Sequence, residues 1–145
     1  MKHIKYSLHK IGDHPGIVRY TGDREAGPAF LERINYDAEG MDREQITDLS
    51  AYQPEEGVEW IRLIGVQDTD MIRRIGECFK IDLLVLEDIA HVGIRSKVDF
   101  YDDYSFFVFD TMYRDSESHA IQEQISVIRT QNTVITFQGA VSGIF

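Results

Sequence analysis

The sequence is poor in cysteine and proline, with a single cysteine, Cys78, and 3 prolines in 145 residues. One cysteine cannot form an intrachain disulfide, so a reducing, intracellular setting is expected. No apolar run approaches the roughly 20 residues that cross a bilayer, since the densest stretches are Leu83 to Leu86 and Phe106 to Phe109. Basic side chains are also scarce, 15 against 25 acidic ones, and the formal net charge is −10. This balance excludes a general attraction to nucleic acid or anionic lipid and favours cations.

Composition places the chain among globular proteins. Apolar residues make up 43% and charged residues 28% of the sequence, with 8 Phe, 7 Tyr and 1 Trp. A chain of this length can bury roughly 70% of the surface it exposes when unfolded, so residues 1–145 are expected to form a single domain. No glycine-rich phosphate loop, GxSxG or HExxH motif occurs, and the 5 histidines are not at metal-ligand spacing.

Short apolar or alternating runs between turn residues predict a chain dominated by strands. The expected strands are residues 17–21, 30–36, 58–66, 97–101, 104–113, 120–130 and 133–137. Residues 43–49 suit either a strand or a helix. Both faces of 104–113 carry aromatic side chains, which predicts a central strand covered on both sides. The two helices expected in the middle of the chain can cover only one face, so covering material is expected from further chain or a second copy.

Two helices are expected between the strand 58–66 and the strand 97–101. The first begins after the N-cap residue Asp68 and has Asp70 in its first turn, where the helix dipole favours negative charge. Its apolar positions are Ile72, Ile75 and Phe79, and Cys78, which flanks them, is interpreted as a small buried hydrophobe rather than a reactive thiol. The second helix covers 83–91. Its apolar positions are Leu83, Leu84, Leu86 and Ile89, and Gly93 is suited to end it.

Acidic residues are the candidates for chemistry. Glu87 and Asp88 lie in the second helix, where adjacent side chains point about 100° apart and cannot both bind one ion squarely. Either carboxylate can bind a hard cation such as Mg²⁺ if another comes from elsewhere, and a solvated helix face is the alternative. Asp99, Asp102 and Asp103 form a second acidic group, in which Asp102 and Asp103 are interpreted as turn residues.

The stretch from Trp60 to Gln138 resembles the cytoplasmic N-terminal domain of the CorA family of magnesium and cobalt transporters. The resemblance is an ordered series that spans most of the chain. Its members are Trp60-Ile61-Arg62-Leu63, Phe79 with Leu84-Val85-Leu86-Glu87-Asp88-Ile89, Arg95 to Tyr101, Tyr104 to Val108, Glu123-Gln124-Ile125-Ser126 and Ile135-Thr136-Phe137-Gln138. Leu83 and Ser96 stand where the family often has proline. The family's stalk, membrane helices and Gly-Met-Asn signature are not present, and Gly40-Met41-Asp42 is not that signature.

The resemblance implies an α/β fold, with a mixed sheet in an α/β/α sandwich whose second helical layer comes from sequence after Phe145. It implies a regulatory role in divalent-cation transport, homopentameric assembly of the full-length protein, and a place on the cytoplasmic side of the cell membrane. By the same resemblance, Glu87 and Asp88 form half of a site for regulatory Mg²⁺ or Co²⁺. The partner carboxylates are expected on a neighbour's stalk, and no organic cofactor is implied.

Two other functions are open at this point. A stand-alone module can use the exposed sheet face to bind a protein partner or a second copy. A metal-dependent enzyme can use Asp99, Asp102 and Asp103, although no general base or nucleophile accompanies them. We therefore expect a binding or regulatory domain rather than an enzyme.

Overall fold

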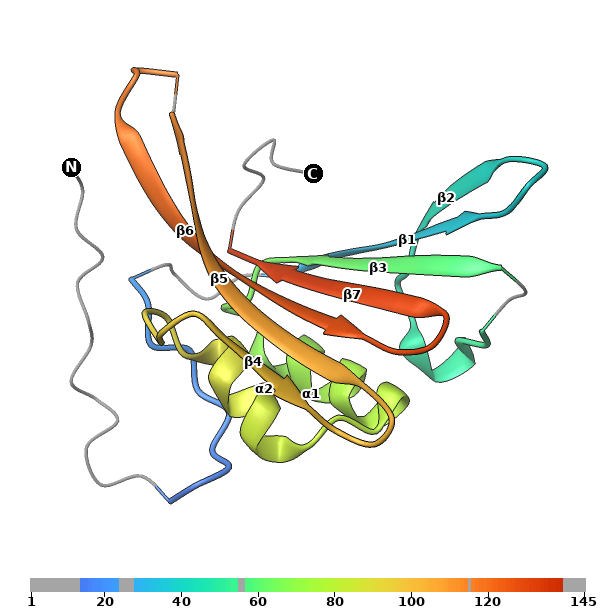
Figure 1. The fold of residues 1–145 in the computed structure, drawn as a ribbon, viewed down its shortest axis with the longest axis horizontal. Helices are drawn as coiled ribbons and strands as arrows, with labels where there is room; N and C mark the ends of the chain where they lie inside the picture. Colours follow the sequence, from blue (N-terminus) through green and yellow to red (C-terminus); the bar gives the residue numbers. More distant parts are fainter. Residues whose placement is uncertain (1–13, 24–27, 55–56, 115, 140–145) are drawn as a thin grey trace.

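The computed structural model describes residues 14–23, 28–54, 57–114 and 116–139, and seven strands in these ranges form one mixed sheet (Figure 1). The strand order is β2-β1-β3-β7-β6-β5-β4. β3 and β7 pair in parallel, and the other neighbours pair antiparallel. The bounds are β1 Phe30–Tyr36, β2 Met41–Gln45, β3 Val58–Ile64, β4 Lys97–Phe100, β5 Ser105–Arg114, β6 Ala120–Arg129 and β7 Thr133–Gln138.

The α-helices α1 (Thr69–Phe79) and α2 (Leu83–Ala90) follow β3, and both begin at an aspartate cap. The Asp68 carboxylate accepts a hydrogen bond of 3.0 Å from the Met71 N–H, as expected from the sequence. The Asp82 carboxylate caps α2 by accepting 2.8 Å from the Leu84 N–H. A short 3-10 helix, η2, spans Leu49–Ala51. No helix in the described ranges is long and apolar enough to span a bilayer.

The core lies between the helices and one face of the sheet. Ile72 and Ile75 of α1 are fully buried against sheet residues that share this face, among them Ile61, Leu63, Phe106, Ile128, Ile135 and Phe137. The helices approach closely at Gly76, where an added Cβ would stand 2.3 Å from a methyl carbon of Leu86. The helices α1 and α2 lie together in Figure 1, and η2 packs on α1. We call this side of the sheet the core face and the other side the open face, although Ile125 and Gln138 on that side are fully buried and the exposed part lies along β4 and β5.

The structure confirms the expected α/β class, corrects two local expectations and resolves a third that the sequence left open. Residues 17–21 form no strand, because their polar groups bond to the helices: the Thr21 N–H donates to the Ala90 carbonyl at 3.3 Å, and the Val18 carbonyl accepts from Arg73 at 2.8 Å. The ambiguous segment 43–49 divides between the end of β2 and the approach to η2. Leu83 and Leu84 are 52% and 53% exposed, because the buried stripe of α2 is Val85, Leu86, Ile89 and Ala90.

The aromatic strand β5 is second from the edge of the sheet and not central. Phe106 and Val108 are buried on the core face, whereas Phe109 on the open face is 38% exposed. Residues paired across strands share a face, so Val98, opposite Phe107, and Phe100, opposite Ser105, also belong to the open face. Phe100 is 80% exposed. Among the described helices, α1, α2 and η2 all supply residues to the core-face cluster.

Candidate cation site on helix α2

The carboxylates of Glu87 and Asp88 turn to different partners. Glu87 accepts a hydrogen bond of 2.6 Å from the Gly16 N–H, which ties the segment before β1 to α2. Asp88 accepts 2.8 Å from the Lys97 ammonium and keeps 30% of its side chain exposed. The different partners agree with helix geometry, in which adjacent side chains point about 100° apart.

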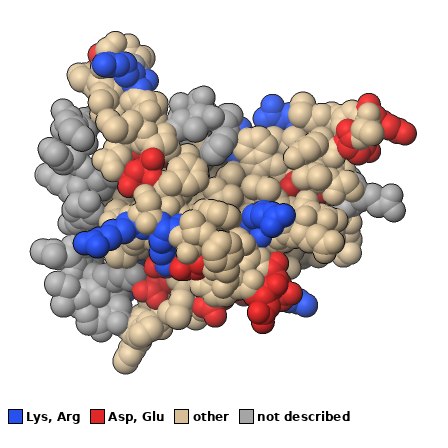
Figure 2. Space-filling view, viewed as in Figure 1, with Lys and Arg blue, Asp and Glu red and all other residues tan. Residues whose placement is uncertain are grey.

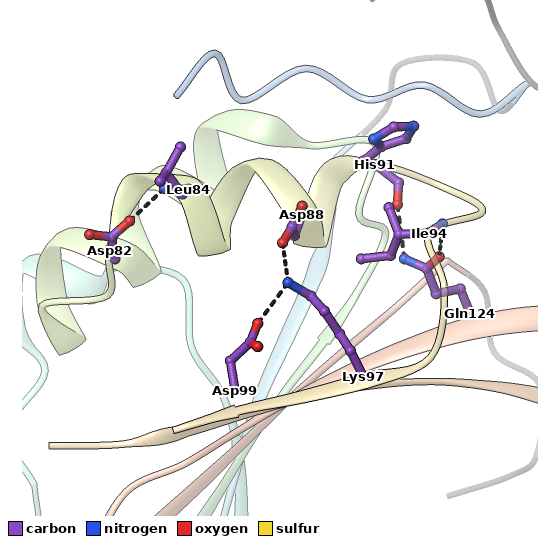
Figure 3. Close-up of polar contacts among 8 residues, drawn as sticks. All are labelled: Asp82, Leu84, Asp88, His91, Ile94, Lys97, Asp99 and Gln124. Carbon is purple, nitrogen blue, oxygen red and sulfur yellow. Dashed lines mark hydrogen bonds and ion pairs between the residues drawn. The ribbon is translucent and has the colours of Figure 1, made fainter. Parts of the chain in front are cut away.

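Lys97 joins two carboxylates from different elements (Figure 3). Its Nζ lies 2.8 Å from Asp88 Oδ2 on α2 and 2.6 Å from Asp99 Oδ2 on β4. Lys97 and Asp99 are two residues apart in β4, so their side chains leave the strand on the same side. They pair with Val108 and Phe106, which belong to the core face, and this register directs both toward α2.

The Lys97 ammonium is held in its charged form. Partial burial lowers the pKa of Lys97, but hydrogen bonds and charge from Asp88 and Asp99 outweigh burial and raise it to about 12. The Nζ also lies 5.4 Å from the centre of the Phe106 ring, within the range of a cation–π contact. The cluster of Asp88, Lys97 and Asp99, called the α2–β4 triad below, therefore carries a formal charge of one negative unit.

Gln124 of β6 holds the connection between α2 and β4 (Figure 3). Its Oε1 accepts hydrogen bonds from the N–H groups of Gly93 at 2.8 Å and Ile94 at 3.1 Å. Its Nε2 donates to the His91 carbonyl at 2.9 Å. One side chain thus satisfies three backbone groups in the turn that leads from Asp88 to Lys97.

The other candidate residues do not form a site together. Asp102 and Asp103 are exposed in the turn between β4 and β5, as expected, and this turn is closed by a hydrogen bond of 2.9 Å from the Tyr101 N–H to the Tyr104 carbonyl. Only Asp99 of that acidic group takes part in the triad. Burial raises the pKa of the half-buried Cys78 thiol, which keeps it protonated near neutral pH.

The oxygen donors of the triad suit a hard divalent cation. Mg²⁺ binds one or two carboxylates and keeps several waters, and the Asp88 and Asp99 carboxylates already converge on one cationic nitrogen. Within the described ranges, no group of three or more His, Cys, Asp or Glu side chains is arranged to hold a metal. The described residues thus bring two carboxylates together on one cationic nitrogen.

Sequence reasoning missed Lys97 and Gln124 as residues of this site. Both lie in motifs that carry the family resemblance, but a lysine two residues before an aspartate in a strand is the only local signal for Lys97. The signal for Gln124 is weaker, because its partners lie about 30 residues earlier in the chain.

Two further clusters of charges, one on each face of the sheet, lie at its other end and are built on arginine. Glu32 accepts 3.2 Å and 2.9 Å hydrogen bonds from Arg43 and lies 3.6 Å from Arg62. Arg33 lies 2.8 Å from Glu44 and 3.6 Å from Glu59, whose side chain is only 2% exposed. Glu59 also accepts a hydrogen bond from the Tyr52 hydroxyl, and burial together with this carboxylate raises the pKa of Tyr52.

Charge on the surface is mixed rather than divided. Figure 2 shows acidic and basic side chains interspersed over the face viewed. The net charge of −10 is therefore not gathered into one acidic patch on this face. Attraction of a cation to this face must therefore come from particular carboxylates.

Comparison with solved structures defines the class of protein by fold. The chain superposes on 37% of the full-length CmaX protein with a TM-score of 0.64, 8% identity and 81% of this chain covered. It superposes on 33% of the CorA magnesium transporter from Methanocaldococcus jannaschii with a TM-score of 0.54, 9% identity and 78% of this chain covered. At these identities the likeness shows the shared α/β fold alone.

The sequence itself relates the chain to the CorA family. It is 36% identical over 140 residues to the cobalt/magnesium transport protein CorA of Thermotoga maritima, which covers 94% of this chain. The chain is homologous to that transport protein and spans 40% of its length. No family model matches the sequence. The homology confirms the resemblance that the motifs indicated. The homologous protein is a transport protein and not an enzyme.

Proposed function

We propose that residues 1–145 form one regulatory domain of a CorA-like divalent-cation transporter. The observation that carries the proposal is the homology to a cobalt/magnesium transport protein over 94% of this chain. In this proposal the full-length protein is a homopentamer, and the domain faces the cytoplasm beside the cell membrane. The ion that the domain senses, Mg²⁺ or Co²⁺, is also the transported substrate.

Asp88 is proposed as the principal ligand for the regulatory ion, with Glu87 beside it. Glu87 is bonded at 2.6 Å to the backbone N–H of Gly16, whereas the partner of Asp88, Lys97 at 2.8 Å, is a flexible side chain that can move away. Carboxylates from a neighbouring subunit complete the site. A bound ion bridges two acidic subunits and favours a closed pore, and loss of the ion lets like charges repel and shifts the population toward open states.

A chimeric transporter tests this function directly. This chain replaces the homologous residues of Thermotoga maritima CorA, and Mg²⁺ uptake into liposomes is recorded as internal or external Mg²⁺ is raised. Asp88→Asn and Asp88→Lys should weaken inhibition by Mg²⁺ on the cytoplasmic side, because the bridging carboxylate is lost or replaced by a cation. Transport at low Mg²⁺ should persist.

Asp70→Asn is the matched control, because it removes one carboxylate from α1, where the side chain is 83% exposed and paired only locally with Arg73. Its Mg²⁺ inhibition should equal that of the parent chimera. Inhibition that is unchanged in both Asp88 variants would count against a regulatory role for this carboxylate.

Exposed apolar side chains on the open face support a second function, in which the chain binds a protein partner. Val98 is 48%, Phe100 80% and Phe109 38% exposed, and these residues lie on neighbouring strands. Apolar surface of this kind favours association. Light scattering should show self-association of the chain that the double variant Val98→Ser, Phe100→Ser reduces, and a monomer that binds no hydrophobic dye would contradict this function.

A further inference from the structure

The proposed regulatory site already contains a cation of its own. The Lys97 ammonium lies within 2.8 Å of both Asp88 Oδ2 and Asp99 Oδ2, in the place where a bridging ion would stand. A divalent ion that binds Asp88 through the same oxygen must displace or repel this ammonium. The affinity of the site for divalent ions therefore depends on how firmly Lys97 is held.

We propose that Lys97 is a tethered competitor of the regulatory ion, and that Asp99 is a further ligand that the ion gains when Lys97 moves away. This inference rests on the proposed function, since it concerns the regulation of the same site. Lys97 sets the divalent concentration at which the site fills, and the exchange converts an internal ion pair into an ion bridge.

Charge favours the exchange only when divalent ions are abundant. With Lys97 in place, the two carboxylates keep one uncompensated negative charge, and a divalent ion in the same place neutralises both. Against this, the ammonium is part of the chain, and a flexible tether of this length gives an effective concentration in the millimolar range. To compete, a free ion must therefore be present at a comparable concentration or bind the carboxylates more tightly than the ammonium does.

The exposure of the triad allows the lysine to move. The side chains of Lys97 and Asp99 are 37% and 39% exposed. Lysine is a compact point charge on a flexible stem, whereas arginine fits a carboxylate with a planar two-donor fork. The ammonium can therefore swing toward solvent and leave both carboxylates.

The test compares Lys97 variants of the chain itself by calorimetric titration with MgCl₂ and with CoCl₂. Lys97→Met keeps an unbranched stem and removes the charge, and it should bind both ions about tenfold more tightly, the change that 1.4 kcal/mol of lost competition produces. Lys97→Arg should bind no more tightly than the parent chain. Arg74→Met is the charge-matched control from an exposed position on α1 and should leave the affinity unchanged.

Second-site variants separate this inference from the proposed function. In the Lys97→Met background, Asp88→Asn and Asp99→Asn should each abolish the gain in affinity, and circular dichroism verifies that every variant is folded. If Lys97→Met gives no tighter binding, or if the gain survives both aspartate variants, the competitor role is wrong. Such a result leaves the Asp88 variants of the chimeric transporter to decide the proposed function separately. If Asp88→Asn fails to alter transport while Lys97→Met still tightens binding, the proposed function falls and the competition stands.

Discussion

Carboxylates at the two ends of the sheet are neutralised in different ways. At the β1–β3 end, arginines bind them: Arg43 makes two hydrogen bonds to Glu32, and Arg33 lies beside the buried Glu59. At the β4 end, one lysine is shared by two carboxylates that are 30% and 39% exposed. Of these arginine pairs, Arg33–Glu59 is buried and cannot lose one partner cheaply, whereas the Arg43 side chain is 51% exposed. The lysine triad is half-exposed, and our proposal is that it exchanges its cation for a divalent ion.

Removing the buried carboxylate of Glu59, which lies beside Arg33, should cause the largest loss of stability. Glu59→Ala should lower the free energy of unfolding by about 3 kcal/mol, because Arg33 loses its most buried partner and the Tyr52 hydroxyl loses its acceptor. Urea denaturation followed by circular dichroism measures the loss. Glu44→Ala, which removes an exposed partner of the same arginine, should cost less than about 1 kcal/mol. Equal losses would show that burial does not distinguish the two carboxylates.

Loosening the support of the lysine triad should have the next largest effect. Gln124→Ala removes three hydrogen bonds to the turn between α2 and β4, and it should cost about 2 kcal/mol in the same measurement. Gln122→Ala serves as the control, since Gln122 is exposed two residues earlier on the same strand. A loss in the control as large as in Gln124→Ala would mean that the turn is not held by this side chain.

The triad itself should add little stability. Asp88→Asn should lower the free energy of unfolding by less than about 1 kcal/mol, because half-exposed ion pairs are screened by water and salt. Added Mg²⁺ should also stabilise the parent chain only slightly, about 0.4 kcal/mol even when its concentration equals the dissociation constant. Thermal melting with and without Mg²⁺ measures this shift. A large shift in the parent chain would show a complete site within these residues.

The smallest effect should appear at alkaline pH. The pKa of Lys97 is raised from 10.5 to about 12 in the folded chain, so its stabilising contribution is complete below pH 10.5 and is lost as the pH rises through about 12. The difference in unfolding free energy between the parent chain and Lys97→Met should therefore shrink over this window. Burial also raises the pKa values of Tyr101 and Tyr104, so these residues lower the stability at alkaline pH in both the parent chain and the variant. A difference that does not change with pH would contradict the ion-pair role of Lys97.

Much of the fold follows from local patterns. Asp68 caps α1 as predicted, because the cap and the apolar stripe lie within one short segment. The strands β4 to β7 lie close to their predicted bounds, since alternation and turn residues are also local signals. The buried stripe of α2 was predicted less well: an uninterrupted run of apolar residues does not say which of them face the core, and Leu83 and Leu84 face outward.

By itself, the sequence determined both helices and most of the strands, the divergence of Glu87 from Asp88, and the relation to CorA proteins. Helical geometry is enough for the divergence, and an ordered series of motifs is enough for the relation. The tertiary structure alone decided that β5 lies second from the edge, and that Lys97 and Asp99 meet Asp88. Strand order and the packing of α2 on the sheet depend on contacts between distant residues, which no local pattern records. The site and the cation that occupies it are therefore properties of the folded chain.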